Sequence, residues 1–182
     1  MLYQKYTVRK RRRREGRTNY KKRIKLLLSK KPRLVVRKTN DHITAQIIEF
    51  NPKGDKVLAS AHSKNLQKLG WTFSNNNLPA SYLLGMLIAQ KSKEKKCIEA
   101  ILDTGLNSSI KGSKIYAVAK GAIDNGLNIH HSINIIPDEK RLNGEHIIEY
   151  AKKVKGKGTQ FSKFDPNSFK KIFEEVKNKI IK

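Results

Sequence analysis

The chain has 182 residues, of which 37% are hydrophobic, so it is long enough to bury a core in one domain with extensions. Forty Lys and Arg against fifteen Asp and Glu give a formal net charge of +25, which destabilises a compact state unless a polyanion neutralises it. No apolar run approaches the ~20 residues that span a bilayer, and no apolar segment of a secretory signal follows the basic start. These bounds predict a cytoplasmic, soluble protein that binds a polyanion and has no membrane partner.

The positive charge is concentrated at the start of the chain. Residues 1–40 contain seventeen Lys or Arg and a single Glu. Residues 1–19 have few apolar side chains, so we expect an extended arm that is disordered without its partner. From Tyr20 onward the apolar residues fall at helical spacing, which predicts a short basic amphipathic helix from about 18 to 29.

Three β-rich runs follow Pro32, and they read "RLVVRKT" (33–39), "HITAQIIEF" (42–50) and "KVLASAHS" (56–63). The turn sequences "TND" and "NPKGD" separate them. Three strands joined by short turns predict an antiparallel meander.

The middle of the chain changes to helical periodicity. Helices are expected over "ASYLLGMLIAQKSKEK" (80–95) and "KGSKIYAVAKGAIDNG" (111–126), with a buried strand between them at "CIEAILD" (97–103). The lone Cys97 cannot form an intramolecular disulfide and is expected to be buried and inert. The predicted fold class is α/β, with a mixed sheet that starts with an antiparallel meander and has helices packed on it.

The end of the chain is predicted to be helical over 137–154 and 165–182. In the last helix Asp165 is the expected N-cap, and Phe169, Phe173 and Val176 share one face. We therefore divide the chain into a basic N-terminal arm and short helix (1–29), an α/β RNA-binding core (30–136) and a helical C-terminal extension (137–182).

The sequence contains no pattern typical of a catalytic or cofactor site. Its five histidines show no metal-ligand spacing, and no phosphate-binding loop or nucleophile motif is present. Carboxylates such as Asp103 and Asp124 could be imagined as acid/base pairs, but we expect them to be surface or helix-stabilising charges. The predictions are therefore no enzyme activity, no cofactor, no metal site and no small-molecule substrate.

The arm has the composition of a nucleic-acid-binding segment, because guanidinium groups match phosphate oxygens and stack on bases. Counterion release from several such contacts gives strong, salt-sensitive binding with little sequence selectivity. Attachment to any polyanion is the less specific alternative. The candidate RNA contacts in this region are Arg9, Lys10, Arg11, Arg12, Arg13, Arg14, Arg17, Tyr20 and Arg23.

The meander offers a second candidate surface. Strand alternation places Leu34 and Val36 in the core and Arg33 and Arg37 on an exposed face. Such a face could address ribose hydroxyls and base edges, or it could be the ordinary solvent face of a half-buried sheet. The polar residues that would continue it are Thr39, Asn40, His42, Thr44 and Gln46, with Ser60 and His62 on the third strand.

Two aromatic residues each have two interpretations. Tyr20 could stack on a base or anchor the basic helix to the sheet, and anchoring is favoured. Trp71, within "LGWTFSNNNLPA", is expected to be a packing anchor for a polar loop, with base stacking as the alternative.

An ordered set of motifs resembles a known family. These are "RRRREGRTNYKKRIKLLLSKKPRLVVRKTNDHITAQIIEF", "ASAHSKNL", "EAILDTGL", "KGSKIYAVAKGAIDNGLNIHHS" and "PDEKRLNGEHI". Over about residues 5–154 the chain resembles the large-subunit ribosomal proteins of the universal L-eighteen family, in the archaeal form related to eukaryotic L-five.

This resemblance implies a structural constituent of the large ribosomal subunit that binds 5S rRNA and anchors it in the central protuberance. The implied partners are 5S rRNA, large-subunit rRNA and neighbouring ribosomal proteins, including the other 5S-associated protein. The family brings neither an enzyme activity nor a cofactor. Its RNA-facing motifs match the arm residues named above and, on the sheet face, Arg33, Arg37, Thr39, Asn40, His42, Gln46, Ser60 and His62.

Two alternatives from other classes stay open on the residues alone. A basic DNA-binding or chromatin-like protein would use the same arm and would bind duplex DNA equally well. A nucleic-acid-processing enzyme would need turnover that depends on a carboxylate such as Asp103.

Overall fold

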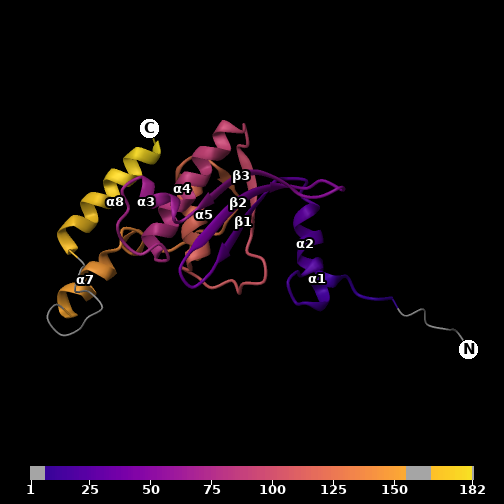
Figure 1. The fold of residues 1–182 in the computed structure, drawn as a ribbon, viewed down its shortest axis with the longest axis horizontal. Helices are drawn as coiled ribbons and strands as arrows, with labels where there is room; N and C mark the ends of the chain where they lie inside the picture. Colours follow the sequence, from indigo (N-terminus) through magenta and orange to yellow (C-terminus); the bar gives the residue numbers. More distant parts are fainter. Residues whose placement is uncertain (1–6, 155–164, 182) are drawn as a thin grey trace, which may run out of the picture.

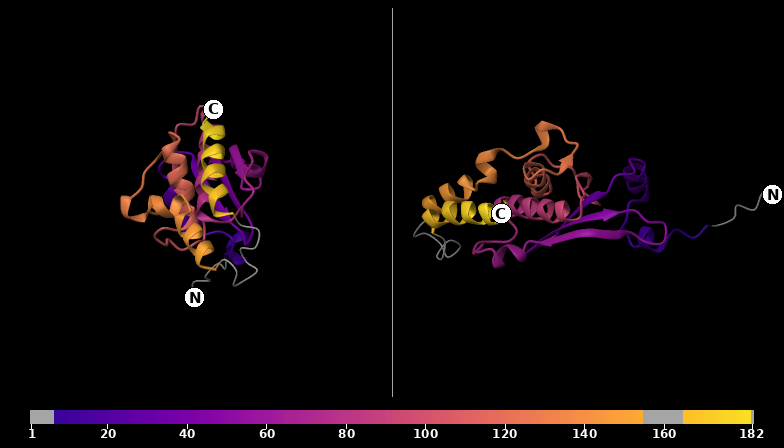
Figure 2. Two further views of the ribbon diagram at one scale, coloured as in Figure 1. Left: turned by 90° about the vertical axis from the view of Figure 1, so that its left-hand side faces the viewer. Right: turned by 90° about the horizontal axis from the view of Figure 1, so that it is seen from above.

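The computed structural model describes residues 7–154 and 165–181. Figure 1 shows the elements in chain order, and Figure 2 shows the same ribbon from two further sides. The helices are α1 (Arg11–Arg14), α2 (Tyr20–Leu27), α3 (Asn65–Lys68), α4 (Leu78–Glu94), α5 (Lys114–Asp124), the 3-10 helix η1 (Ile133–Ile135), α6 (Glu139–Leu142), α7 (Glu145–Val154) and α8 (Pro166–Ile181). The strands are β1 (Arg33–Lys38), β2 (Ile43–Glu49), β3 (Lys56–His62), β4 (Glu99–Asp103) and β5 (Asn128–Ile129).

The strands form one mixed sheet in the order β3-β2-β1-β4-β5. β1, β2 and β3 pair antiparallel through short turns, which confirms the predicted meander. β4 pairs parallel to β1, and β5 pairs parallel to β4, because α4 and α5 are crossover connections that bring the chain back to the same end of the strands. The α/β fold class is therefore confirmed.

One face of the sheet is covered by α4 and α5. Leu34 and Val36 of β1 point into this core, as alternation predicts, and Leu84 of α4 and Val118 of α5 pack in the same cluster. Cys97 belongs to this cluster and is buried, and burial raises the pKa of its thiol. The main core thus lies between the sheet and two helices.

Two glycines let α4 and α5 approach each other closely. A Cβ atom on Gly85 would overlap the carbonyl oxygen of Val118, and one on Gly121 would overlap the carbonyl oxygen of Tyr82. Each helix therefore places a glycine against the backbone of the other. Both helices end near the positions that the sequence predicts.

A second hydrophobic cluster surrounds Trp71 and includes α8. The indole is 1% exposed, its ring lies edge-on to Phe169 and Phe173 of α8, and its Nε1 donates to the carbonyl oxygen of Ser74. The interpretation of Trp71 as a packing anchor is confirmed. Figure 1 shows α8 beside α3 and α4, far from the N-terminal elements.

The predicted helix over 137–154 is divided. α6 ends at Leu142, and Gly144 has a φ of +79°, a left-handed conformation that interrupts the helix before α7 begins at Glu145. The predicted last helix is present as α8. The "KGKG" segment at 155–158 lies outside the described residues, and the division into 1–29, 30–136 and 137–182 stays a prediction.

Candidate nucleic-acid interface

The basic helix α2 is held against the sheet on the side opposite α4 and α5. Asn19 caps its N-terminus, with the Lys22 backbone N–H donating to Asn19 Oδ1 at 3.1 Å. The side chain of Lys22 reaches past the end of β4, where its Nζ donates to Thr104 Oγ1 at 2.6 Å and to the carbonyl oxygen of Gly105 at 3.2 Å. These contacts fix one end of α2 to the loop after β4.

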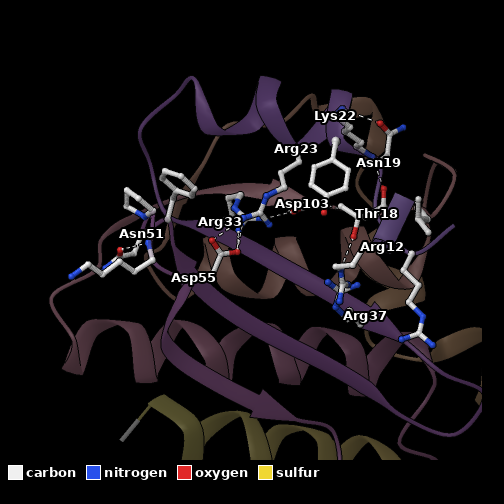
Figure 3. A pocket seen from close by; sticks show the side chains of 18 residues that line it. Arg12, Thr18, Asn19, Lys22, Arg23, Arg33, Arg37, Asn51, Asp55 and Asp103 are labelled. Carbon is white, nitrogen blue, oxygen red and sulfur yellow. Dashed lines mark hydrogen bonds and ion pairs between the residues drawn. The ribbon is translucent and has the colours of Figure 1, made fainter. Parts of the chain in front are cut away.

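The other attachment of α2 is a network of four charged side chains. Arg33 of β1 donates from Nη2 to Asp55 Oδ2 at 2.7 Å and from Nη1 to Asp103 Oδ2 at 2.9 Å. Arg23 of α2 donates from Nη2 to the same Asp55 carboxylate, at 2.8 and 2.9 Å. Figure 3 shows Arg23 and Arg33 converging on Asp55. The network joins α2, β1, the β2–β3 turn and the end of β4.

This network corrects two predictions from the sequence. Arg33 was expected on an exposed face, yet it is 3% exposed, and Asp103 was expected at the surface, yet it is 9% exposed. Alternation correctly placed Arg33 opposite Leu34, but α2 covers that end of the face. Arg33 holds Asp55, which in turn holds α2 through Arg23.

A cleft of about 510 Å³ lies between α2 and the sheet. Five cationic side chains from the predicted set contribute to its wall, together with Tyr20 and the apolar side chains of Phe50 and Leu106 (Figure 3). The predicted residues that line it are Arg12, Arg17, Tyr20, Arg23, Arg33 and Arg37.

The arm carries most of the remaining cations on an exposed surface. Residues 11–14 form one turn of helix, α1, where the sequence predicts an extended segment, and residues 1–6 lie outside the described part. Glu15 pairs with Arg11 and with Arg17, each at 3.2 Å. Across residues 7–154 and 165–181, Arg9, Arg13 and Arg14 have no ion-pair partner.

The predicted sheet face is present as two adjoining cross-strand rows. Arg37 is paired with Thr44, and Thr44 with His62. In the next row on the same face Gln46 stands between Val35 and Ser60. Arg37 belongs both to this face and to the cleft, so it connects the two groups of candidate residues.

Thr39, Asn40 and His42 lie in and beside the β1–β2 turn. Asn76 holds this turn by donating from Nδ2 to the carbonyl oxygens of Thr39 and Asn40, and Lys114 Nζ donates to Asn76 Oδ1 at 3.0 Å. Asn77 caps α4 by accepting from the Ala80 N–H at 2.8 Å. The polar loop after Trp71 therefore orients one end of the candidate surface.

The pKa of His62 depends on the neighbouring His42 on this face. Burial, then the nearby charges of His42 and Lys64, lower the pKa of His62 below 6.5, and the two imidazole rings are 4.8 Å apart. Because the folded-state pKa is lowered, the unfolded state takes up this proton first. The free energy of unfolding therefore decreases as the pH falls below about 6.5. Replacing His42 with Gln should raise the pKa of His62 but leave it below 6.5, because burial remains.

Ring-carbon NMR titration of the wild-type protein and of His42→Gln measures this shift. An identical His62 titration in both proteins would show that the neighbouring imidazole has no influence on it.

Several residues of the interface were not predicted from the sequence. Lys22, Phe50, Asp55 and Leu106 line the cleft, but none of them is among the candidate contacts named from the sequence. A signal exists for Asn19, which precedes the first apolar residue of the helix as an N-cap should. Asp55 gives no such signal, because its partners lie 22 and 32 residues away in the sequence.

Other kinds of site find no support in the described residues. Within 7–154 and 165–181 no three His, Cys, Asp or Glu residues gather as metal ligands would. No helix in the same ranges has the length and apolar character of a membrane span.

Comparison with known proteins agrees with the motifs. The model of the family described as "Ribosomal large subunit proteins 60S L5, and 50S L18" matches residues 4–97 and 90–132. The "Large ribosomal subunit protein uL18" of Korarchaeum cryptofilum (strain OPF8) is 48% identical over 183 residues, which covers 96% of this chain and 94% of that protein. This likeness favours the ribosomal hypothesis over the DNA-binding one. The chain therefore belongs to this ribosomal protein family, as a structural constituent of the large subunit of the cytoplasmic ribosome with rRNA and ribosomal proteins as its partners, and not as an enzyme.

Proposed function

We propose that the protein binds 5S rRNA and anchors it in the central protuberance of the large subunit. The neighbours there would be large-subunit rRNA and the other 5S-associated protein. The observation that carries the proposal is that some cations are paired with carboxylates inside the fold while others, on the arm, are not. Asp55 and Asp103 engage Arg23 and Arg33, whereas the arm residues Arg9, Arg13 and Arg14 face outward without carboxylate partners in the described structure.

The arm supplies affinity in this proposal, and the sheet face supplies recognition. Phosphate contacts from an arm are insensitive to sequence and weaken with salt. The rows through Arg37, Thr44 and His62 and through Gln46 and Ser60 present donors and acceptors for the 2′-hydroxyls and base edges of RNA. The RNA-contact set is the one predicted from the sequence, with Arg33 as a positioning residue.

Removing the arm's charge should weaken binding more than removing the same charge elsewhere. We expect Arg9, Arg11, Arg13 and Arg14 replaced together by Ala to lower affinity for 5S rRNA steeply. The slope of log affinity against log salt should fall by about 0.7–0.9 for each phosphate that the variant no longer neutralises. The matched control replaces four lysines on other elements, Lys95, Lys152, Lys153 and Lys171. Binding is measured with 5S rRNA in excess tRNA across a salt series.

Three outcomes would contradict the proposal. An equal loss of affinity in both four-residue variants would mean that only net charge matters. Complete displacement of 5S rRNA by tRNA would mean that the isolated chain has no specificity for it. Equal affinity for duplex DNA would favour the DNA-binding alternative.

A further inference from the structure

We propose that the cleft between α2 and the sheet receives one unstacked nucleotide of the bound RNA, with its base against Tyr20 and its phosphate at Arg12 and Arg37. This inference rests on the proposed function and specifies what the RNA must offer at this site. It predicts that part of the protein's affinity depends on an unpaired nucleotide and not on duplex shape.

The size and lining of the cleft suit such a ligand. Its volume of about 510 Å³ lies within the range of about 300–1,000 Å³ that is usual for small-molecule sites. One part of the wall is apolar, because it is formed by the side chains of Phe50 and Leu106. These side chains are 52% and 58% exposed, so neither is buried in the core. Arg12, Arg17 and Arg37 supply cations to the same cleft. A base and a phosphate are the two chemical parts that this combination matches.

The charge of the cleft is positive in spite of its two carboxylates. Asp55 is engaged by Arg23 and Arg33, and Asp103 by Arg33 and by the Gly105 backbone N–H at 2.9 Å. Arg37 has no ion-pair partner in the described ranges, and the side-chain hydrogen bond of Arg12 there uses only Nε, which donates to Thr18 Oγ1 at 2.9 Å. The remaining guanidinium N–H groups can donate to a phosphate.

Tyr20 is placed to provide a stacking surface. It is the first residue of α2, directly after the Asn19 cap, so its backbone is fixed by the helix start. The ammonium group of Lys10 lies over the ring, 4.9 Å from its centroid, so a base is expected on the opposite face. Unstacked bases of RNA commonly stack on aromatic side chains, and such contacts tolerate any base.

The α2 side of the cleft is held in place by contacts within the chain. The contacts of Lys22 with Thr104 and Gly105 and the network around Asp55 fix α2 over the sheet at both attachments. Binding a nucleotide therefore does not have to order α2 as well, which favours affinity.

The decisive experiment compares Tyr20→Ala and Tyr20→Phe on two RNAs. One probe is 5S rRNA and the other is a fully paired RNA duplex of similar length. We expect Tyr20→Ala to weaken 5S rRNA binding about tenfold and to leave duplex binding unchanged, since stacking needs an unpaired base. Tyr20→Phe should bind both RNAs as the wild type does. Tyr150→Ala, which removes a half-exposed tyrosine from α7, is the matched control.

The results separate this inference from the proposed function. If the wild-type protein prefers 5S rRNA but Tyr20→Ala binds it normally, the cleft proposal is wrong and the proposed function stands. An equal loss of affinity on the duplex would also overturn the cleft proposal. If the wild-type protein has no preference for 5S rRNA, the proposed function fails. The cleft is then tested with a single-stranded oligonucleotide, on which an unchanged affinity of Tyr20→Ala overturns it.

Two further measurements do not depend on how well Tyr20→Ala folds. Ultraviolet crosslinking of the wild-type complex should join an unpaired nucleotide to residues 17–25, and crosslinks confined to residues 39–46 and 60–62 would overturn the proposal. Titration with adenosine monophosphate should give only millimolar binding. Micromolar binding would mean that the cleft is a site for a free nucleotide.

Discussion

Replacing Gly121 with Ala is expected to destabilise the fold by about 3 kcal/mol or more, because a close-packed interface cannot absorb the added methyl group without moving. The Cβ would overlap the carbonyl oxygen of Tyr82, which is backbone and cannot rotate away. Helices α4 and α5 would have to separate, and both pack on the sheet. Gly85→Ala should act in the same way, through the carbonyl oxygen of Val118. Urea unfolding followed by circular dichroism measures the change.

Lys120→Ala is the matched control for this prediction. It changes the adjacent position on α5, removes a partly exposed ion pair with Asp124 and should cost less than about 1 kcal/mol. Equal stabilities of Gly121→Ala and Lys120→Ala would show that the helix crossing is looser than the structure indicates.

Replacing Arg33 with Met should cost about 3–5 kcal/mol, the usual effect of removing one partner from a buried ion pair. The methionine fills a similar volume, but it leaves Asp103 buried beside an apolar side chain. It also leaves Asp55 with Arg23 as its remaining charged partner in the network. Relative to the wild type, amide exchange should then speed up more in α2 than in α4, because the network is one of the two attachments of α2.

Arg37→Met provides the contrast, since it lies on the same face of β1, is exposed and has no ion pair in the described structure. Its stability should stay within about 0.5 kcal/mol of the wild type. Its affinity for RNA should fall nevertheless, whereas Arg33→Met should lose stability first. A stable Arg33→Met protein with unchanged exchange in α2 would contradict the role given to the network.

Local patterns in the sequence predict most of the elements but not what covers them. The meander, α2, α4, α5 and α8 follow from periodicity and turn residues near their observed bounds. Alternation also places Arg37, Thr44 and Gln46 on the face opposite the core. The same rule predicts the face of Arg33 correctly but not its burial. Arg33 is buried because α2 covers it, and the docking of α2 depends on carboxylates that are distant in the sequence. Asp103 is 70 residues away from Arg33, and nothing near either residue reports their pairing.

Other features depend on contacts between elements in the same way. Gly85 and Gly121 look like ordinary weak points within their helices, and only the crossing of α4 and α5 explains them. The division between α6 and α7 did have a local signal, the Asn143-Gly144 pair, since such dipeptides often mark turns. The same holds for the candidate site. Its cations can be predicted from the sequence, but the cleft cannot, because it exists only when α2 is docked on the sheet.

The packing of α8 on Trp71 has a consequence for the order in which a nascent chain matures. The five strands of the described structure, and the cleft with them, are complete in the sequence before residue 130, whereas α8 is synthesised after every other described element. Until then the indole lacks its ring contacts with Phe169 and Phe173. A chain interrupted before residue 166 would display this aromatic surface, a substrate that chaperones and proteases recognise, beside an otherwise complete sheet. Docking of α8 is thus the step that covers Trp71 and completes this cluster.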